Sequence, residues 1–385
     1  MDVKTRSRRE CIHDRRGMQR AGIETDYSEG NPRETAKRRF DMSLALVRSM
    51  TVAICALLSV AAHGGDSGHG ASAGTSVSYG PVTDFGSVWV NGVEFATTNS
   101  SVTVDNSAMP DDAHDAGPDH HRGLKRGMVV RVEGSFDSNS VTGTATRVTY
   151  RSNLMGPITK ISAHASGRVL TLVAAGQTVL IDSQTWVATP TMADMQGVAA
   201  AAGALATGNV VAVSGLPEAT GAIRATRVEK TSDTLAAYVA YGGEIEAKGT
   251  IRNIGAASFN IGNLTVRYAA GTTALPTEGL RDGQPVEAKG ASFDASTNTL
   301  VATRITPDAD TLGVTDAGKV EIEGFVSAVT SRDIGVLFTV GTQPVKTTPS
   351  TNFEPAGGEI ITGARLEVEG VLTGGTLTAT KISFK

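Results

Sequence analysis

Short runs of alternating apolar and polar residues fill most of the chain, and one such run occurs four times. Each copy reads Gly-x-x-apolar-x-apolar-x-Gly and is followed within 9 to 12 residues by Ala-Thr-Arg/Lys-Val/Ile. The copies are 127–134 with 145–148, 208–215 with 225–228, 283–290 with 302–305, and 363–370 with 379–382. The four alanines are 80, 77 and 77 residues apart. This regular spacing predicts four tandem copies of one small β unit.

The Gly-flanked run has the period of a strand with one face in a core. Its third and fifth inner positions are always apolar: Val130, Val211, Val286 and Leu366, then Val132, Val213, Ala288 and Val368. The positions that follow each of them vary freely: Arg131, Ala212, Glu287 and Glu367, then Glu133, Ser214, Lys289 and Glu369. We therefore expect the first set to face the core and the second set to face solvent. The flanking glycines suit tight turns or bulges.

Each unit is expected to contain five strands in the same order. An opening strand starts near Gly86, Gly156, Gly249 or Gly324, and two further strands follow, as in 169–173 with 177–181. A variable insertion then precedes the two repeated strands. This order favours an all-β chain of four OB-like five-stranded barrels, in which residues 192–205 permit a short helix in unit two. A looser meander or an SH3-like barrel is the alternative.

The same pattern places the unit boundaries. The units are predicted at 81–150, 151–230, 242–307 and 318–385, with connectors at 231–241 and 308–317 and a Gly/Ser/His-rich linker at 63–80.

Residues 42–62 have the features of a secretory signal peptide. A short segment with one positive charge, Arg48, precedes an apolar run at 51–62, and Val60-Ala-Ala62 provides the small residues of a cleavage site. The run is too short to span a bilayer, so the signal is the only membrane contact that we expect before cleavage. Cleavage after Ala62 predicts a periplasmic or secreted protein. His63 stands where a lipid-attachment cysteine would be, so no lipid anchor is expected.

Residues 1–41 show no hydrophobic periodicity. They are interpreted as a disordered or spurious extension upstream of a start at Met42, in preference to an unusually long signal region. Both cysteines, Cys11 and Cys55, precede the predicted cleavage site, so the exported chain has no disulfide.

Composition and charge restrict the function further. Aromatic residues make up only 5% of the 385 residues and Gly numbers 44, which suits many short strands better than a helical enzyme. Removal of residues 1–62 takes 12 of 35 Lys and Arg and 8 of 39 Asp and Glu, leaving a net charge of −8. An acidic chain repels phosphate backbones, so general nucleic-acid binding is not expected.

The repeated Gly-x-x-Val-x-Val-x-Gly and Ala-Thr-Arg-Ile phrases resemble the bacterial domain-of-unknown-function family 5666. The resemblance extends over nearly all of residues 81–385, and the segment 86–95 is similar to the opening of such domains in exported proteobacterial proteins. It implies an exported, mostly β protein and supplies no known activity or site residues. Departures are the missing lipid-attachment cysteine, Pro285 within one Gly-flanked strand, and Lys381 in place of the usual Arg.

A His- and Asp-rich segment in unit one is the candidate metal site. Asp111, His114, Asp115, His120 and His121 offer imidazole and carboxylate donors of the kind that bind Zn, Ni or Cu. Their spacing does not match a structural zinc site, so a solvated insertion is the alternative and weak, exchangeable metal binding is the functional interpretation.

A cation follows Ala-Thr in every unit: Arg147, Arg227, Arg304 and Lys381. These side chains are candidates for contacting a carboxylate or sugar of a ligand. The structural interpretation is that each pairs with Glu or Asp on a neighbouring strand. Carboxylates are not found at one strand position in all units, so no repeated acid/base set is expected.

The sequence therefore predicts a non-catalytic exported protein without a cofactor. It acts as a scaffold or binding module for an envelope component, glycan or peptide. One alternative is an OB-type ligand binder for an oligosaccharide, a peptide or, less favoured, single-stranded nucleic acid. The other is weak periplasmic metal binding by the His/Asp segment.

Overall fold

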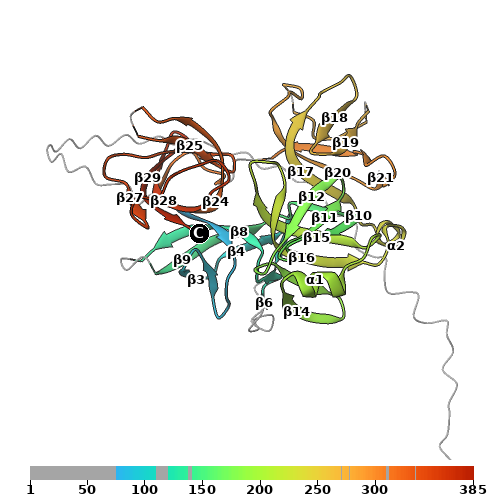
Figure 1. The fold of residues 1–385 in the computed structure, drawn as a ribbon, viewed down its shortest axis with the longest axis horizontal. Helices are drawn as coiled ribbons and strands as arrows, with labels where there is room; N and C mark the ends of the chain where they lie inside the picture. The colour runs from blue at the N-terminus through green and yellow to red at the C-terminus, as the bar shows by residue number, and fades with distance from the viewer. Residues whose placement is uncertain are drawn as a thin grey trace, which may run out of the picture. The chain divides into compact units, whose positions relative to one another are not determined.

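The computed structural model describes residues 75–109, 120–137, 141–269, 271–276, 278–308, 312–333 and 335–385. All of them belong to one unit of the chain, His69–Lys385. Nearly every described element is a strand, as Figure 1 shows, which confirms the predicted all-β class. The predicted signal peptide and residues 1–41 lie outside the described residues.

The second repeat forms a closed five-stranded barrel. Its strands are β10 (Leu154–Ala163), β11 (Leu170–Ala174), β12 (Gln177–Ile181), β15 (Val210–Pro217) and β16 (Ile223–Ser232). β10 pairs with β11, β11 with β12, β15 with β16, and β10 with β15, all antiparallel, while β12 and β16 are parallel. The order first–second–third–fifth–fourth–first is that of an OB-type barrel, which confirms the prediction.

The other three repeats have the same strand order. Barrel 1 consists of β1 (Ser76–Pro81), β2 (Val88–Val90), β3 (Val93–Ala96), β8 (Val129–Phe136) and β9 (Thr142–Tyr150). Barrel 3 consists of β17 (Ile245–Arg252), β18 (Ser258–Ile261), β19 (Leu264–Arg267), β20 (Pro285–Gly290) and a divided fifth strand, β22 (Thr299–Val301) and β23 (Arg304–Pro307). Barrel 4 consists of β24 (Ala317–Ser331), β25 (Leu337–Val340), β26 (Gln343–Lys346), β28 (Arg365–Thr373) and β29 (Thr376–Phe384).

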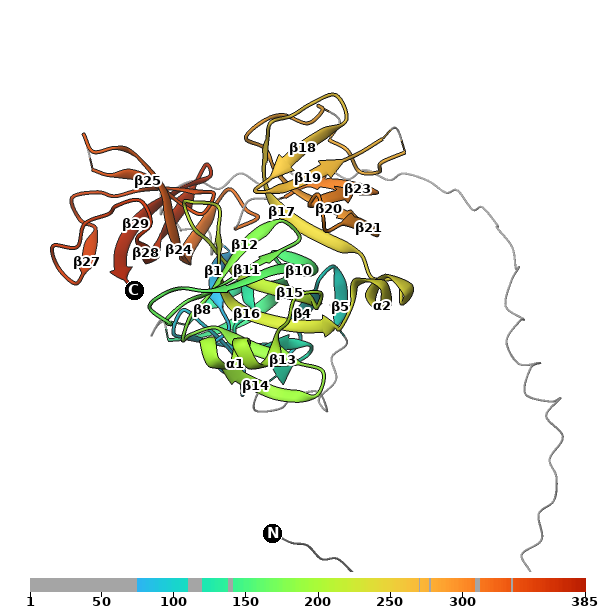
Figure 2. The ribbon, with the colours of Figure 1, turned by 45° about the vertical axis from the view of Figure 1, so that its right-hand side comes forward.

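Accessory elements fill the insertion after the third strand in barrels 1, 2 and 4, whereas the accessory strand β21 (Ser292–Asp294) of barrel 3 follows its fourth strand. Strands β4 (Ser101–Val104), β13 (Trp186–Thr189) and β27 (Asn352–Glu354) run parallel to the fifth strand of their barrel. The remaining strands are β5 (Ser107–Met109), β6 (His120–His121), β7 (Leu124–Lys125) and β14 (Met192–Gln196). Helix α1 (Val198–Ala204) lies beside β14 in Figure 2 and buries Ala201, so the predicted helix of unit two is present but shorter. A second helix, α2 (Leu235–Ala240), occupies the predicted connector 231–241.

The first barrel begins earlier than predicted. Its opening strand β1 starts at Ser76, within the predicted linker 63–80, and the predicted opening strand at 86–90 contains the second strand β2. The polar Ser78 is fully buried at the register position that Leu154 and Ile322 occupy in other barrels. Because a serine stands at this core position, apolar–polar alternation gives no sign of β1.

The repeated apolar positions build the four cores. The side chains at the third and fifth inner positions of all four Gly-flanked strands are 0% exposed, which confirms the inward prediction. Each barrel has its own cluster of buried side chains around these residues. The prediction that the intervening positions face solvent is wrong in part: Ser214, Glu287, Lys289 and Glu367 are at most 9% exposed. Ser214, Glu287 and Lys289 point out of their own barrels but are covered by neighbouring barrels, as shown below, and Glu367 pairs with Lys385 of its own barrel at 2.7 Å.

Both glycines of the repeated phrase have a backbone requirement. The opening glycines, such as Gly127 and Gly208, have φ of +81° and +94°, where a Cβ atom is disfavoured. A Cβ atom on the closing glycines would lie 2.1–2.4 Å from a carbonyl oxygen of the fifth strand: Thr144 for Gly134, Arg224 for Gly215, Val301 for Gly290 and Thr378 for Gly370. The strand ladder shifts register before Gly134, Gly215 and Gly370, so a β-bulge brings the two backbones together.

The threonine of Ala-Thr-Arg/Lys completes this bulge. Its hydroxyl donates to the carbonyl of the residue before the closing glycine in every barrel, at 3.0 Å for Thr146, 3.1 Å for Thr226, 3.3 Å for Thr303 and 3.1 Å for Thr380. The preceding alanine is 1–4% exposed in all four. The repeated motif thus forms a core strand and a bulge, and its threonine hydroxyl provides a hydrogen bond for the backbone carbonyl at the bulge.

Main-chain pairing also joins barrels to one another. β1 of barrel 1 runs parallel to β24 of barrel 4, and β10 of barrel 2 runs antiparallel to β17 of barrel 3. Between barrels 1 and 2, the Thr226 hydroxyl shares its one hydrogen between the Ser214 carbonyl and the Gly127 carbonyl, which lies 2.5 Å away, and the Val129 amide donates to the Ser214 hydroxyl at 2.8 Å. These contacts explain why Ser214 is buried.

Candidate binding cleft

Three of the four repeated cations form exposed ion pairs. Arg147 is 57% exposed and lies 3.9 Å from Glu133, and Arg304 is 44% exposed and lies 3.8 Å from Glu244. Lys381 lies 3.0 Å from Glu354 and 3.3 Å from Glu369. Each of these cations therefore has a carboxylate partner in the protein itself.

Arg227, the fourth cation, is 2% exposed and lies at the joint between barrels 1 and 2. Its guanidinium is 2.5 Å from Asp194 and 3.1 Å from Glu229, and it donates to the Arg126 carbonyl of barrel 1 at 3.1 Å. It also borders a cavity of about 210 Å³ with Tyr150. Here the repeated cation bridges two barrels.

Most of the candidate metal site lies outside the described residues. Asp111, His114 and Asp115 are in this group, and of His120 only the main chain, in β6, is described. The His121 Nε2 atom is 2.9 Å from the Thr97 hydroxyl. Among the residues that the structure describes, no group of three or more His, Cys, Asp and Glu side chains is placed to hold a metal ion.

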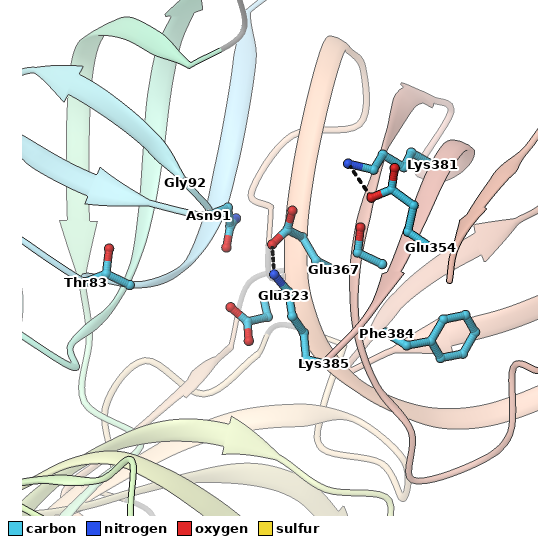
Figure 3. A pocket seen from close by; sticks show the side chains of 10 residues that line it. Thr83, Asn91, Gly92, Glu323, Glu354, Glu367, Lys381, Phe384 and Lys385 are labelled. Carbon is cyan, nitrogen blue, oxygen red and sulfur yellow. Dashed lines mark ion pairs between the residues drawn. The ribbon is translucent and has the colours of Figure 1, made fainter. Parts of the chain in front are cut away.

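A polar cleft of about 500 Å³ lies between barrels 1 and 4. In Figure 3 the barrel 1 wall carries Thr83, Asn91 and Gly92, and the facing barrel 4 wall carries alternating acids and lysines. The charged residues of that wall are Glu323, Glu354, Glu367, Lys381 and Lys385. Dashed lines in the same view mark the pairs Glu354–Lys381 at 3.0 Å and Glu367–Lys385 at 2.7 Å. The cleft therefore has one neutral wall and one charged wall, and the third acid of the charged wall, Glu323, pairs with Arg365 at 2.7 Å.

The acidic wall places carboxylates directly opposite one another. Glu323 on β24 faces Glu367 on β28, and Glu321 faces Glu369. Like charges in such cross-strand pairs are destabilising unless they are compensated. Arg365 lies 2.7 Å from Glu323, and Lys319 lies 3.1 Å from Glu321.

Glu321 lies next to this wall, two residues before Glu323 on β24. It is 3% exposed, and burial raises its pKa to about 7, against the opposing effect of the nearby Lys319. Its Oε2 atom has no hydrogen-bond partner among the described residues.

The corresponding positions in barrel 3 carry complementary charges. Glu246 on β17 faces Lys289 on β20 at 2.5 Å, and Lys248 faces Glu287. Burial raises the pKa of Glu246 to about 7; burial also tends to raise that of Glu287, but Glu246, Lys248 and Arg151 together hold it at about 2. An acid and a base with separated pKa values resemble a catalytic pair.

In barrel 3, however, these groups bind one another. Arg151, which precedes β10, lies 2.8 Å from Glu287, and Lys248 donates to the Ser152 carbonyl at 2.5 Å. The four charged side chains of the ladder are only 4–10% exposed. The network joins barrels 2 and 3, which explains the burial of Glu287 and Lys289.

Sequence reasoning missed that carboxylates recur in two of the four units. Glu246 and Glu321 both stand three residues before the glycine of the first strand, Gly249 or Gly324, and Glu287 and Glu367 share one position of the Gly-flanked strand. Aligning units three and four alone reveals this signal. A comparison across all four units hides it, because units one and two differ there.

The comparisons agree with the repeat architecture. The family model described as "Domain of unknown function (DUF5666)" matches residues 79–149, 155–229, 248–306 and 323–383. These matches cover more than half of the chain, and the chain belongs to this family. No curated protein matches the sequence. In the part of the chain that the structure describes, no helix is long and apolar enough to cross a membrane.

Proposed function

We propose that this four-barrel protein is an exported, non-catalytic scaffold and binding module. The observation that carries the proposal is that the residues repeated in all four barrels have structural roles. The apolar positions fill cores, the glycines and threonines form bulges, and the cations pair with carboxylates of the protein. Because the repeat is committed to structure, it does not supply a reactive group to each barrel.

The cleft between barrels 1 and 4 favours a second, more specific role as a ligand binder. Its acids are neutralised by Lys381, Lys385 and Arg365, and Thr83 offers a hydroxyl on the facing wall. Each acid of the cleft has a cationic partner, so the charged wall carries little net charge and suits a polar ligand without a net charge. A neutral oligosaccharide or a peptide fits this description.

A pair of matched variants tests the cleft. Residues 63–385 are applied to glycan and peptide arrays, and each ligand found is titrated against E354A/K381A and E244A/R304A. Each variant removes the repeated cation of one barrel together with a carboxylate partner. E354A/K381A removes such a pair in the cleft, and E244A/R304A removes the corresponding pair in barrel 3. We expect loss of binding only in E354A/K381A. Equal binding by both variants rules out the cleft, and arrays without any ligand leave only the scaffold role.

Cell fractionation tests the location. The proposal expects the protein in the periplasm or medium, with a mature N-terminus at His63 when the purified protein is sequenced from its end. Retention in the cytoplasm with an uncleaved N-terminus contradicts export. This result is independent of the binding assays, which use purified protein.

A further inference from the structure

The outer face of one sheet in barrel 3 presents two rows of side chains. The sheet has the order β17-β18-β19-β22-β21, and these strands belong to the barrel shown in Figure 2. Strand register places Arg252, Asn260, Thr265, Thr299 and Asp294 in one row, and Ser258, Arg267, Val301 and Ser292 in the next. The alternating residues Ile251, Phe259, Ile261, Val266 and Leu300 are buried in the core, so both rows point outward.

The two arginines of this face are not neutralised. Arg252 and Arg267 are exposed, and neither has an ion pair or side-chain hydrogen bond among the described residues. This contrasts with the paired repeat cations above. Asp294, the acid of the first row, lies at the far end of that row. Its carboxylate accepts hydrogen bonds from the Ser296 hydroxyl at 2.6 Å and the Thr297 hydroxyl at 2.9 Å.

The spacing of the two arginines suits an extended ligand. Arg252 and Arg267 are two strands apart and offset by two residues. With roughly 4.8 Å between strands and 3.4 Å per residue, their backbones are about 12 Å apart. One small anion cannot bridge that distance easily, whereas a polymer with repeated anionic groups can contact both.

The remaining side chains of the face identify the polymer. Asn260 donates to the Leu264 carbonyl at 3.3 Å and to the Thr265 hydroxyl at 3.2 Å, which orients that hydroxyl between the arginines with its own hydrogen left to donate. Val301 is 47% exposed and provides an apolar surface beside Arg267. Hydroxyl-binding groups beside an apolar side chain suit a sugar ring. The two rows contain no aromatic side chain, so they lack the stacking platform that single-stranded nucleic acid requires.

We propose that this face of barrel 3 binds an acidic polysaccharide. Arg252 and Arg267 pair with carboxylate or sulfate groups of successive sugars, because a guanidinium forms planar, two-point bonds with such groups. The Thr265 hydroxyl donates to a sugar hydroxyl between them. The proposal rests on the binding role given above but concerns a different surface and a different ligand from the cleft.

The test uses purified residues 63–385 and polygalacturonate, with neutral dextran as the uncharged probe. We expect R252S/R267S to weaken polygalacturonate binding at least tenfold, measured by calorimetry at low salt, because both charged contacts are lost. The matched control is K160S/R168S, which removes two exposed cations of barrel 2 and causes the same change in net charge. We expect the control to stay within about twofold of the wild type and dextran not to bind.

Two outcomes overturn the proposal. Equal weakening in both double variants shows attraction by overall charge, and undetectable polygalacturonate binding by the wild type excludes this ligand class. Both outcomes concern the barrel 3 face only. If E354A/K381A abolishes binding of a ligand at the cleft, the proposed function stands even though the polysaccharide site fails. Circular dichroism of each variant checks that the barrels remain folded.

Discussion

The buried carboxyl of Glu321 is expected to make the joint between barrels 1 and 4 less stable as the pH rises. Glu321 lies on β24, next to Ser78 of β1 and opposite Glu369 of β28. Burial raises its pKa from 4.5 to about 7, Lys319 opposes this, and Glu369 and Glu367 add to it. Lys319 itself lies 4.0 Å from the centre of the Phe136 ring of barrel 1. Both charged groups therefore belong to the joint.

The direction and size of the effect follow from linkage. The folded-state pKa is above the unfolded value, so the folded state holds the proton more tightly. The resulting stability is fully present below about pH 4.5 and is lost as the pH rises to about 7. Each unit of difference corresponds to roughly 1.4 kcal/mol, which gives a loss of about 3 kcal/mol from this carboxyl.

The variant Glu321→Gln removes the titration while keeping the shape of the side chain. We expect it to match the wild type near pH 4 and to exceed its free energy of unfolding by about 3 kcal/mol near pH 8. Urea unfolding followed by circular dichroism measures the difference, and hydrogen exchange of β24 and β28 assigns it to barrel 4. Glu354→Gln is the control, because Glu354 is 54% exposed. An unchanged pH dependence in Glu321→Gln refutes the reasoning.

Three further predictions concern the repeat and the candidate metal segment. Gly370→Ala places a Cβ atom 2.1 Å from the Thr378 carbonyl oxygen and should cost about 1–3 kcal/mol in thermal unfolding, whereas Gly203→Ala in α1 meets no atom within 4 Å and should cost nothing. Arg227→Ala leaves Asp194 and Glu229 without their buried partner and should cost about 3–5 kcal/mol, against less than about 1 kcal/mol for the exposed Arg147→Ala. Calorimetry with Zn, Ni and Cu should show weak binding that disappears in H114A/H120A/H121A, and a triple variant that binds as the wild type does excludes the His/Asp segment.

The sequence predicted the parts of the fold that depend on one barrel at a time. Val130, Val211 and their equivalents identified the core face because alternation reports which side of a strand meets its own barrel. The same alternation does not report whether a second barrel covers the other side. Glu287 and Lys289 therefore looked solvent-facing, although they are buried at the joint between barrels 2 and 3.

The cleft was beyond sequence reasoning for the same reason. Its walls come from residues near 90 and from residues 323–385, which the parallel pairing of β1 with β24 brings together. That pairing connects strands more than 230 positions apart in the chain, and Ser78 gives β1 no apolar signal. Strand order was predictable, but the choice of neighbouring barrel depends on side chains that differ between units.

This division also indicates where function should be sought. Residues shared by all four barrels form the bulges, fill the cores and make ion pairs within the protein. Changing them is therefore expected to alter stability before it alters binding. Barrels 3 and 4 differ at the same ladder positions: Lys248 and Lys289 in one correspond to Glu323 and Glu369 in the other. The first arrangement closes a joint with complementary charges, whereas the second places like charges opposite one another beside a cleft, where Arg365 and Lys319 compensate them. Ligand specificity is therefore expected to depend on the positions that differ between barrels. Substitutions at these positions best separate an effect on binding from an effect on folding.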